Sequence, residues 1–184
     1  MKIKNFKLTL RIKEVYNNLK QKNIKFTEEI ETLVSVVEKE LQEVISPSVV
    51  FDTFDVKKDE RMKNFVNFLQ IPKNVDSVSF IILTLGEKIE SFVSSINDEM
   101  KKIVTETIIA EYLTSCSIFV TKILQEKFED SLEMGSLFLL PENFYKEIIN
   151  LLSADKIGVS YIEETRKLLP KYTSLNYLFW FRKK

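Results

Sequence analysis

The chain has 184 residues, of which 45% are hydrophobic and 29% are charged, a size and composition typical of one globular domain. Its 27 basic and 27 acidic residues give no net charge, so it lacks the basic excess of nucleic-acid-binding proteins. It contains no histidine and one cysteine, which excludes an internal disulfide, a structural zinc site and any Ser–His or Cys–His nucleophile.

Three elements are predicted in the N-terminal quarter of the chain. Apolar and polar residues alternate over residues 7–13, which predicts a short, half-buried strand, although a helix could begin as early as Lys13. Residues 14–22 carry apolar side chains at helical spacing and predict a helix. Thr27 is the expected N-cap of a second helix, whose apolar stripe has helical periodicity and stops before Pro47.

Two strands and two helices are predicted in the middle of the chain. Residues 49–56 and 76–85 have the composition of strands, and the second is the more apolar, so we place it at the centre of a sheet. Gly86 closes this strand. Apolar spacing then predicts helices over residues 87–96 and 98–128.

The C-terminal third is predicted to hold a loop, a helix and two strands. Residues 131–140 are expected to form the loop, and Pro141 suits the first turn of the helix that follows. Residues 157–162 and 175–181 are the predicted strands, separated by a segment that ends in Pro170. Strands scattered among paired helices predict an α+β fold with a mixed, mostly antiparallel twisted sheet, and we expect a single domain over residues 1–184.

Several features predict a cytoplasmic protein without a membrane partner. The one cysteine, Cys116, lies within a predicted helix and suits a small core residue in a reducing compartment. The longest apolar runs are far shorter than a membrane span. The first residues lead into an alternating pattern and do not have the apolar block of a signal peptide.

Acidic and aromatic clusters offer few independent signs of chemistry. Asp52 and Asp55 are three residues apart in a predicted strand, so they point to opposite faces and suit a solvated edge better than an acid–base pair. Glu163 and Glu164 follow a strand, where an exposed position and a site for a metal or a ligand amine are both open. Residues 177–181 suit a buried strand with aromatic side chains on both faces, or a surface that stacks on a planar ligand.

Two sequence motifs resemble those of a known family. Residues 80–87 end in Thr-Leu-Gly-Glu before an amphipathic helix, and this resembles the strand–Thr-Leu-Gly–helix junction of the activation (reactivation) domain of cobalamin-dependent methionine synthase. Residues 151–160 contain a leucine pair, a short turn and Ile-Gly-Val-Ser, as the family does. Residues 163–165 and 170–173 then stand where the family has Thr-Glu-Ser and a Pro-Arg/Lys-Lys-Ser segment. The resemblance covers nearly the whole chain in order.

The resemblance implies a stand-alone reactivation module. In that family the domain binds S-adenosylmethionine and docks on the cobalamin domain, so that inactive cob(II)alamin is reductively methylated. The implied partners are a cobalamin-binding methionine synthase that lacks its own activation domain and a flavodoxin-like reductant. Cobalamin would reach this chain only through that partner, and the protein would contribute positioning, without a catalytic residue or a metal of its own.

The resemblance also implies where S-adenosylmethionine would bind. The loop of the family that contacts this ligand has a Pro-Gly-Tyr core, whereas residues 134–138 here are Met-Gly-Ser-Leu-Phe, so we expect a degenerate pocket. The long helix is also bulkier than the family's over residues 106–110. The expected lining residues are Gly135, Ser136, Phe138, Tyr161, Glu163, Glu164, Lys171 and Tyr172.

Two other functions remain open at this point. The same fold could dock on a corrinoid protein as a scaffold that has lost S-adenosylmethionine binding. The chain could also be an unrelated small-molecule enzyme, which would ignore corrinoid proteins.

Overall fold

The main sheet of the computed structural model is antiparallel throughout. The structure describes residues 1–128 and 130–183. The strand order is β1-β2-β3-β7-β4. A separate hairpin pairs two further strands, β5 with β6. The strands are β1 Lys2–Lys4, β2 Ser48–Asp55, β3 Val75–Thr84, β4 Leu132–Leu139, β5 Ser160–Ile162, β6 Lys167–Leu169 and β7 Thr173–Arg182. The predicted α+β class with a mostly antiparallel sheet is confirmed.

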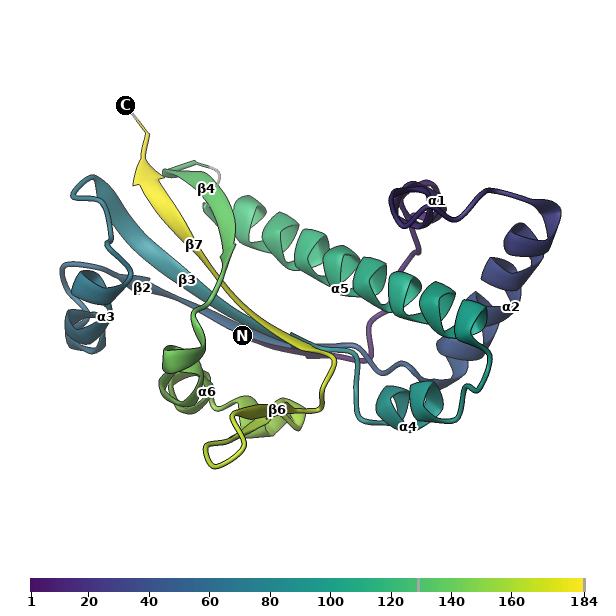
Figure 1. Ribbon diagram of the computed structural model, residues 1–184. Coiled ribbons are helices and arrows are strands. Elements are labelled where there is room, and N and C mark those ends of the chain that lie inside the picture. The colour runs from purple at the N-terminus through teal and green to yellow at the C-terminus, as the bar shows by residue number, and fades with distance from the viewer. Residues whose placement is uncertain (129, 184) are drawn as a thin grey trace.

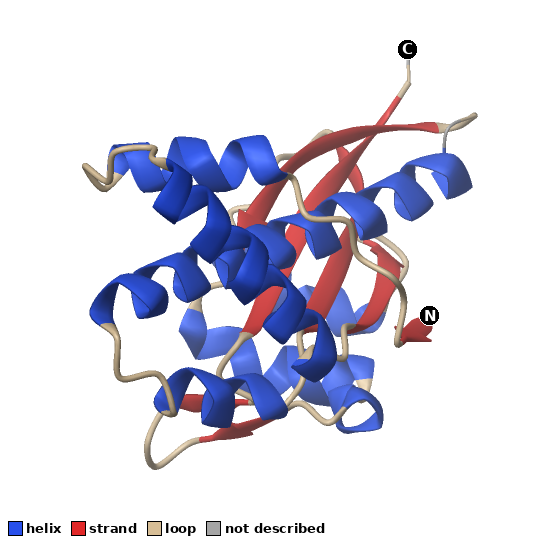
Figure 2. Cartoon of the chain, turned by 90° about the vertical axis from the view of Figure 1, so that its right-hand side faces the viewer, coloured by secondary structure: helices blue, strands red, loops and turns tan. Residues whose placement is uncertain are grey.

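Helices cover both faces of this sheet. Figure 1 shows α5 running along one face, with α3 and α6 on the other. Helices α1, α2 and α4 contact α5 and share its hydrophobic core. Figure 2, which is viewed from the right-hand side of Figure 1, shows helices packed in front of the strands of the sheet. The helices are α1 Ile12–Gln21, α2 Glu28–Val44, α3 Lys63–Phe68, α4 Lys88–Ser94, α5 Glu99–Phe128 and α6 Tyr145–Leu152, with short 3-10 turns η1 Glu60–Met62, η2 Glu142–Phe144 and η3 Ala154–Ile157.

Strand β3 separates two hydrophobic cores, because its alternate residues point to opposite faces. Ile81 and Leu83 belong to the core under α5, and Phe80 and Ile82 belong to the core under α3 and α6. All four are at most 1% exposed, so the central position predicted for this segment is confirmed. Strand β7 is divided in the same way, with Trp180 in the first core and aromatic neighbours in the second.

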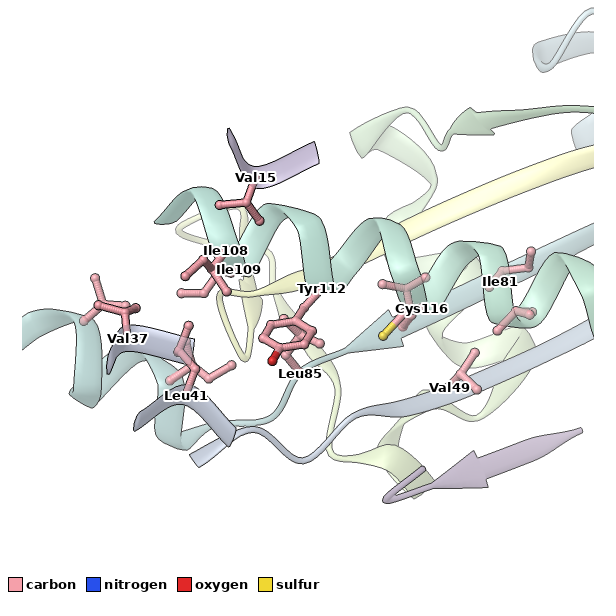
Figure 3. Close-up of a cluster of buried hydrophobic side chains, with 14 of the residues drawn as sticks. Val15, Val37, Leu41, Val49, Ile81, Leu85, Ile108, Ile109, Tyr112 and Cys116 are labelled. Atoms are coloured by element: carbon pink, nitrogen blue, oxygen red, sulfur yellow. The ribbon is translucent and has the colours of Figure 1, made fainter. Parts of the chain in front are cut away.

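Helix α5 is the centre of the first core. Ile108, Tyr112 and Cys116 point from it toward β2, β3 and α2 (Figure 3), and all three side chains are fully buried. Its length and composition would also allow it to cross a membrane, yet half of its most apolar 18-residue stretch is buried inside the fold. The apolar character of α5 is therefore explained by packing.

Helix α2 begins and ends where its sequence predicts. The Thr27 hydroxyl accepts a hydrogen bond from the Ile30 N–H at 3.3 Å, which confirms the N-cap. The helix stops at Val44, because Ile45 is extended ahead of Pro47.

Gly86 forms the turn between β3 and α4. Its φ of +97° lies in the region that favours glycine, and a Cβ there would meet the Ser46 hydroxyl oxygen. Ser46 N–H donates to the Leu85 carbonyl at 2.8 Å, which holds the end of α2 against this turn. The predicted strand-to-helix junction is confirmed.

The strand predicted over residues 7–13 is wrong. This segment is extended but pairs with no strand in the described part of the chain, and α1 already begins at Ile12. Phe6, Leu8 and Leu10 are half-buried against the first core, and the carbonyl of Thr9 accepts a bond from Ser115 of α5 at 3.3 Å. Apolar and polar residues do alternate here, but the alternation arises because every second side chain packs against the core around α5.

Two predictions in the C-terminal third also need correction. Residues 131–140 are not a loop, because they contain edge strand β4, whose Leu132 and Met134 pack against the first core. The strand predicted over residues 157–162 is shorter, since η3 extends to Ile157 and only Ser160–Ile162 pair with β6. Helix α3 was not predicted at all.

Candidate functional site

The predicted site residues come from three places in the fold: strand β4, the β5–β6 hairpin, and the segment that leads into β7. The structure brings Tyr161 and Glu163 into one cleft and places Lys171 in a depression beside it. Gly135, Ser136 and Phe138 lie on β4, before the chain enters that cleft. The eight residues therefore do not line a single pocket.

Gly135 and Ser136 form a β-bulge in β4. Met134 is paired with Trp180 and Leu137 with Leu178, so two residues of β4 lie opposite one of β7. A Cβ on Gly135 would be 2.9 Å from Cε2 of Phe181 and 3.0 Å from the carbonyl oxygen of Phe179. A glycine is therefore required here because β7 approaches closely. This requirement holds whether or not a ligand contacts Gly135.

Phe138 forms an exposed aromatic surface with β7. Its ring stacks on Tyr177, with centroids 5.4 Å apart and an angle of 27°, and lies 5.9 Å from the ring of Phe179. Strand β4 is the last strand of the sheet, and within the described residues no strand pairs with its outer edge. Free backbone groups beside an exposed ring suit the recognition of a planar heterocycle, which needs hydrogen bonds at its edge and a flat contact on its face.

A charged cleft of about 560 Å³ lies between the start of α6 and the β5–β6 hairpin. Its walls combine acidic, basic and aromatic side chains. The lining residues are Glu142, Asn143, Lys146, Glu147, Tyr161, Glu163 and Arg166.

Local sequence builds this cleft from both sides. Glu142 begins the 3-10 turn η2, Lys146 lies in the first turn of α6, and both line the cleft. Tyr161 stands opposite Leu168 in the hairpin. The connecting turn closes with Arg166 at a φ of +53°, and its N–H donates to the Glu163 carbonyl at 3.3 Å.

Two polar contacts cross the cleft. Lys146 Nζ lies 2.7 Å from Glu163 Oε1, and this hydrogen bond raises the pKa of Lys146. The Tyr161 hydroxyl donates to Glu142 Oε1 at 3.3 Å, and its pKa is raised by loss of solvent and by the negative charge of Glu142. In the described part of the chain, no carboxylate is paired with the guanidinium of Arg166.

The depression that holds Lys171 continues the cleft toward α4. It has a volume of about 480 Å³ and shares Glu142 and Arg166 with the cleft. Glu90 of α4 and Tyr145 of α6 contribute to its wall. The two hollows therefore form one continuous surface around the base of the hairpin.

Tyr172 and Glu164 do not join this surface. The ring of Tyr172 packs against the first core, and its carbonyl accepts a bond from the Leu85 N–H at 3.1 Å, so it anchors the start of β7. Glu164 is exposed in the hairpin turn and lines none of the cleft. Their expected contact with a ligand has no support from the arrangement of the side chains.

Sequence reasoning missed five residues of the cleft: Glu142, Asn143, Lys146, Glu147 and Arg166. The four-residue spacing of Glu142 and Lys146 was visible, but nothing in the sequence places α6 beside the hairpin. Metal binding has no support, because no three Cys, Asp or Glu side chains of the described residues gather into a ligand set. Cys116 is buried, and burial raises the pKa of its thiol to about 12.

The edge of β4 and the cleft are close along the chain. Strand β4 ends at Leu139, and Pro141 leads directly to Glu142 at the mouth of the cleft. The four residues from Phe138 to Glu142 span at most about 14 Å. One elongated ligand with a planar end and a charged end could therefore contact both regions.

Comparisons with known proteins were made for sequence and for structure. No family model matches this chain, and no curated protein matches it. Among solved structures, the crystal structure of the MetH reactivation domain bound to AdoHcy matches with a TM-score of 0.65 and 10% sequence identity. The match covers 100% of this chain and 79% of that chain. The chain thus has the fold of that domain, which confirms, at the level of fold, the resemblance seen in the sequence.

Proposed function

We propose that this protein is a stand-alone reactivation module that presents S-adenosylmethionine to the cobalamin of a methionine synthase lacking its own activation domain. The observation that carries the proposal is the likeness of fold, which extends over the whole chain. The similar structure is bound to AdoHcy, the product that remains when S-adenosylmethionine gives up its methyl group.

The chemistry of this role suits a chain with few reactive groups. A flavodoxin-like protein would supply one electron to the partner's cobalamin, which then takes the methyl group from the sulfonium of S-adenosylmethionine. The leaving group is a neutral thioether, so the transfer needs no general acid or base. A chain without histidine can therefore serve by holding the methyl donor at the right place.

The two regions of the candidate site suit the two ends of this ligand. The adenine would stack on Phe138 beside Tyr177 and use the free backbone edge of β4. The methionine end would extend past Pro141 into the charged cleft. The sulfonium would then lie between the two regions, where the partner's cobalamin can approach it.

A second candidate function is a scaffold that docks on a corrinoid protein without binding S-adenosylmethionine. Leu137 and Phe138 favour it, because these large side chains stand where the resemblance places the family's Pro-Gly-Tyr turn and are 36% and 43% exposed. The adjacent Leu139 is 75% exposed. An exposed apolar strand of this kind also suits contact with another protein.

The test is methylation of cobalamin on a methionine synthase fragment that has no activation domain. The fragment, a reductant and S-adenosylmethionine are mixed with this protein, and the absorption spectrum reports conversion of cob(II)alamin to methylcobalamin. We expect conversion only when the protein and S-adenosylmethionine are both present. Binding of the fragment without methylation would favour the scaffold, and no binding in either cobalt state would contradict both functions.

A further inference from the structure

We propose that the cleft between α6 and the β5–β6 hairpin binds the amino-acid end of the ligand, with Arg166 holding its α-carboxylate and Glu163 its α-ammonium group. The inference rests on the proposed function only for the identity of that ligand. The cleft itself assigns the chemical class, which is a zwitterionic α-amino acid carrying an additional positive charge.

Arg166 is the natural anchor for a carboxylate. Arg166 lines both the cleft and the adjoining depression, and no carboxylate of the described residues is paired with its guanidinium. Its backbone is held in the left-handed region by the hairpin turn, with its N–H bonded to the Glu163 carbonyl. A guanidinium presents paired N–H donors that match the two oxygens of a carboxylate.

Glu163 is the group that would take the ammonium. In the free protein it is occupied by Lys146 at 2.7 Å, and both side chains are 57% exposed. Exposed ion pairs contribute little to stability, so an incoming ammonium group can replace Lys146 at small cost. The released Lys146 then stands beside the ligand carboxylate and adds a second positive charge to the anchor.

The balance of charge in the cleft favours the methyl donor over its product. Three carboxylates, from Glu142, Glu147 and Glu163, face two cations, Lys146 and Arg166. S-adenosylmethionine carries a net positive charge from its sulfonium, whereas S-adenosylhomocysteine carries none. A net negative cleft therefore holds the donor more tightly and lets the spent product leave.

The experiment compares ligands that differ at the amino-acid end. Calorimetry measures the affinity of the whole protein for S-adenosylmethionine and for 5′-methylthioadenosine, which keeps the adenosine but lacks that end. The variants are Arg166→Gln and Glu163→Gln. Their matched controls are Lys156→Gln, an exposed cation outside the cleft, and Glu164→Gln, the exposed neighbour of Glu163.

We expect Arg166→Gln to weaken S-adenosylmethionine binding at least about tenfold and to leave the affinity for 5′-methylthioadenosine unchanged. Glu163→Gln should act in the same direction, and both controls should bind as the wild type does. Equal losses for the two ligands, no loss in either variant, or an unmodified protein that does not prefer S-adenosylmethionine would each overturn the assignment.

The same variants separate this inference from the proposed function. Methylation of the partner's cobalamin that survives Arg166→Gln at limiting S-adenosylmethionine would refute the cleft assignment and leave the reactivation role in place. Selective binding of S-adenosylmethionine through Arg166, with no methylation of any cobalamin fragment, would support the cleft and refute the reactivation role.

Discussion

Replacing Gly135 with alanine tests why a glycine stands in the bulge of β4. The added Cβ would lie 2.9 Å from the ring of Phe181 and 3.0 Å from the carbonyl oxygen of Phe179. The ring can turn aside, but the carbonyl belongs to β7 and moves only if the pairing with β4 changes. Overpacking costs about 1–3 kcal/mol, and we expect about 1.5 kcal/mol because part of the strain falls on a mobile ring. For a chain of this size, that loss lowers the Tm by about 3–6 °C.

Urea denaturation of the wild type, Gly135→Ala and the control Ser136→Ala measures this effect. Ser136 is the exposed neighbour in the same bulge, so its substitution should change the unfolding free energy by less than about 0.5 kcal/mol. Gly135→Ala in a Phe181→Ala background should retain part of the loss, because the contact with the Phe179 carbonyl remains. An unfolding free energy equal to that of the wild type, together with weaker S-adenosylmethionine binding, would refute this reasoning and make Gly135 a ligand contact.

Three further predictions concern the core and the surface. Cys116 is buried with its thiol pKa raised to about 12, so it should react with Ellman's reagent at pH 8 only after unfolding, and fast reaction of the native protein would contradict its burial. The pKa of Asp55 is lowered below its ordinary 3.8, chiefly by the Lys58 N–H, so its stabilising contribution should be full above about pH 4 and disappear as the pH falls through the lowered value. Asp55→Asn should therefore flatten the acid limb of unfolding free energy against pH, and an unchanged slope would count against it. The indole N–H of Trp180 donates to Ser79 Oγ at 2.8 Å, so Ser79→Ala should cost about 1–3 kcal/mol in urea denaturation followed by tryptophan fluorescence; a neutral result would mean that the indole finds another acceptor.

Elements with strong periodicity or a defined cap were predictable from the sequence. The Thr27 cap, the apolar segment before Gly86 and the long helix after Asp98 each combine a local signal with a burial pattern that points the same way. These elements contribute most of the first core, so the α+β class could be predicted from them.

The errors occurred where a local pattern has two structural causes. Alternation over residues 7–13 reports which side chains are buried, and an extended segment on α5 buries alternate residues just as a strand does. Residues 131–140 were predicted as a loop, although Gly135 and Ser136 within them form the bulge that lets β4 follow β7. In both segments the structure depends on the neighbouring elements and not on the local sequence alone.

The candidate site was predictable only in part, for a similar reason. Tyr161 and Glu163 could be named because they follow a recognisable motif. Arg166 could not, because its position depends on a left-handed turn that its sequence does not announce. Lys146 depends on the docking of α6 beside the hairpin, which is a tertiary contact.

The position of β7 between β3 and β4 has a consequence for how the molecule assembles during synthesis. Residues 173–182 are the last strand in sequence, yet they fill the interior of the sheet and join β4 to the rest. Until they leave the ribosome, the edge of β3 is unpaired and β4 has no partner strand. The nascent chain then exposes backbone groups that can pair with strands of other chains and aggregate. Folding must therefore wait for contacts between residues that are about 90 to 100 positions apart, as the pairing of Val78 with Phe179 and of Leu83 with Ser174 indicates. We expect ribosome-bound chains that stop before residue 173 to recruit chaperones and to remain sensitive to protease.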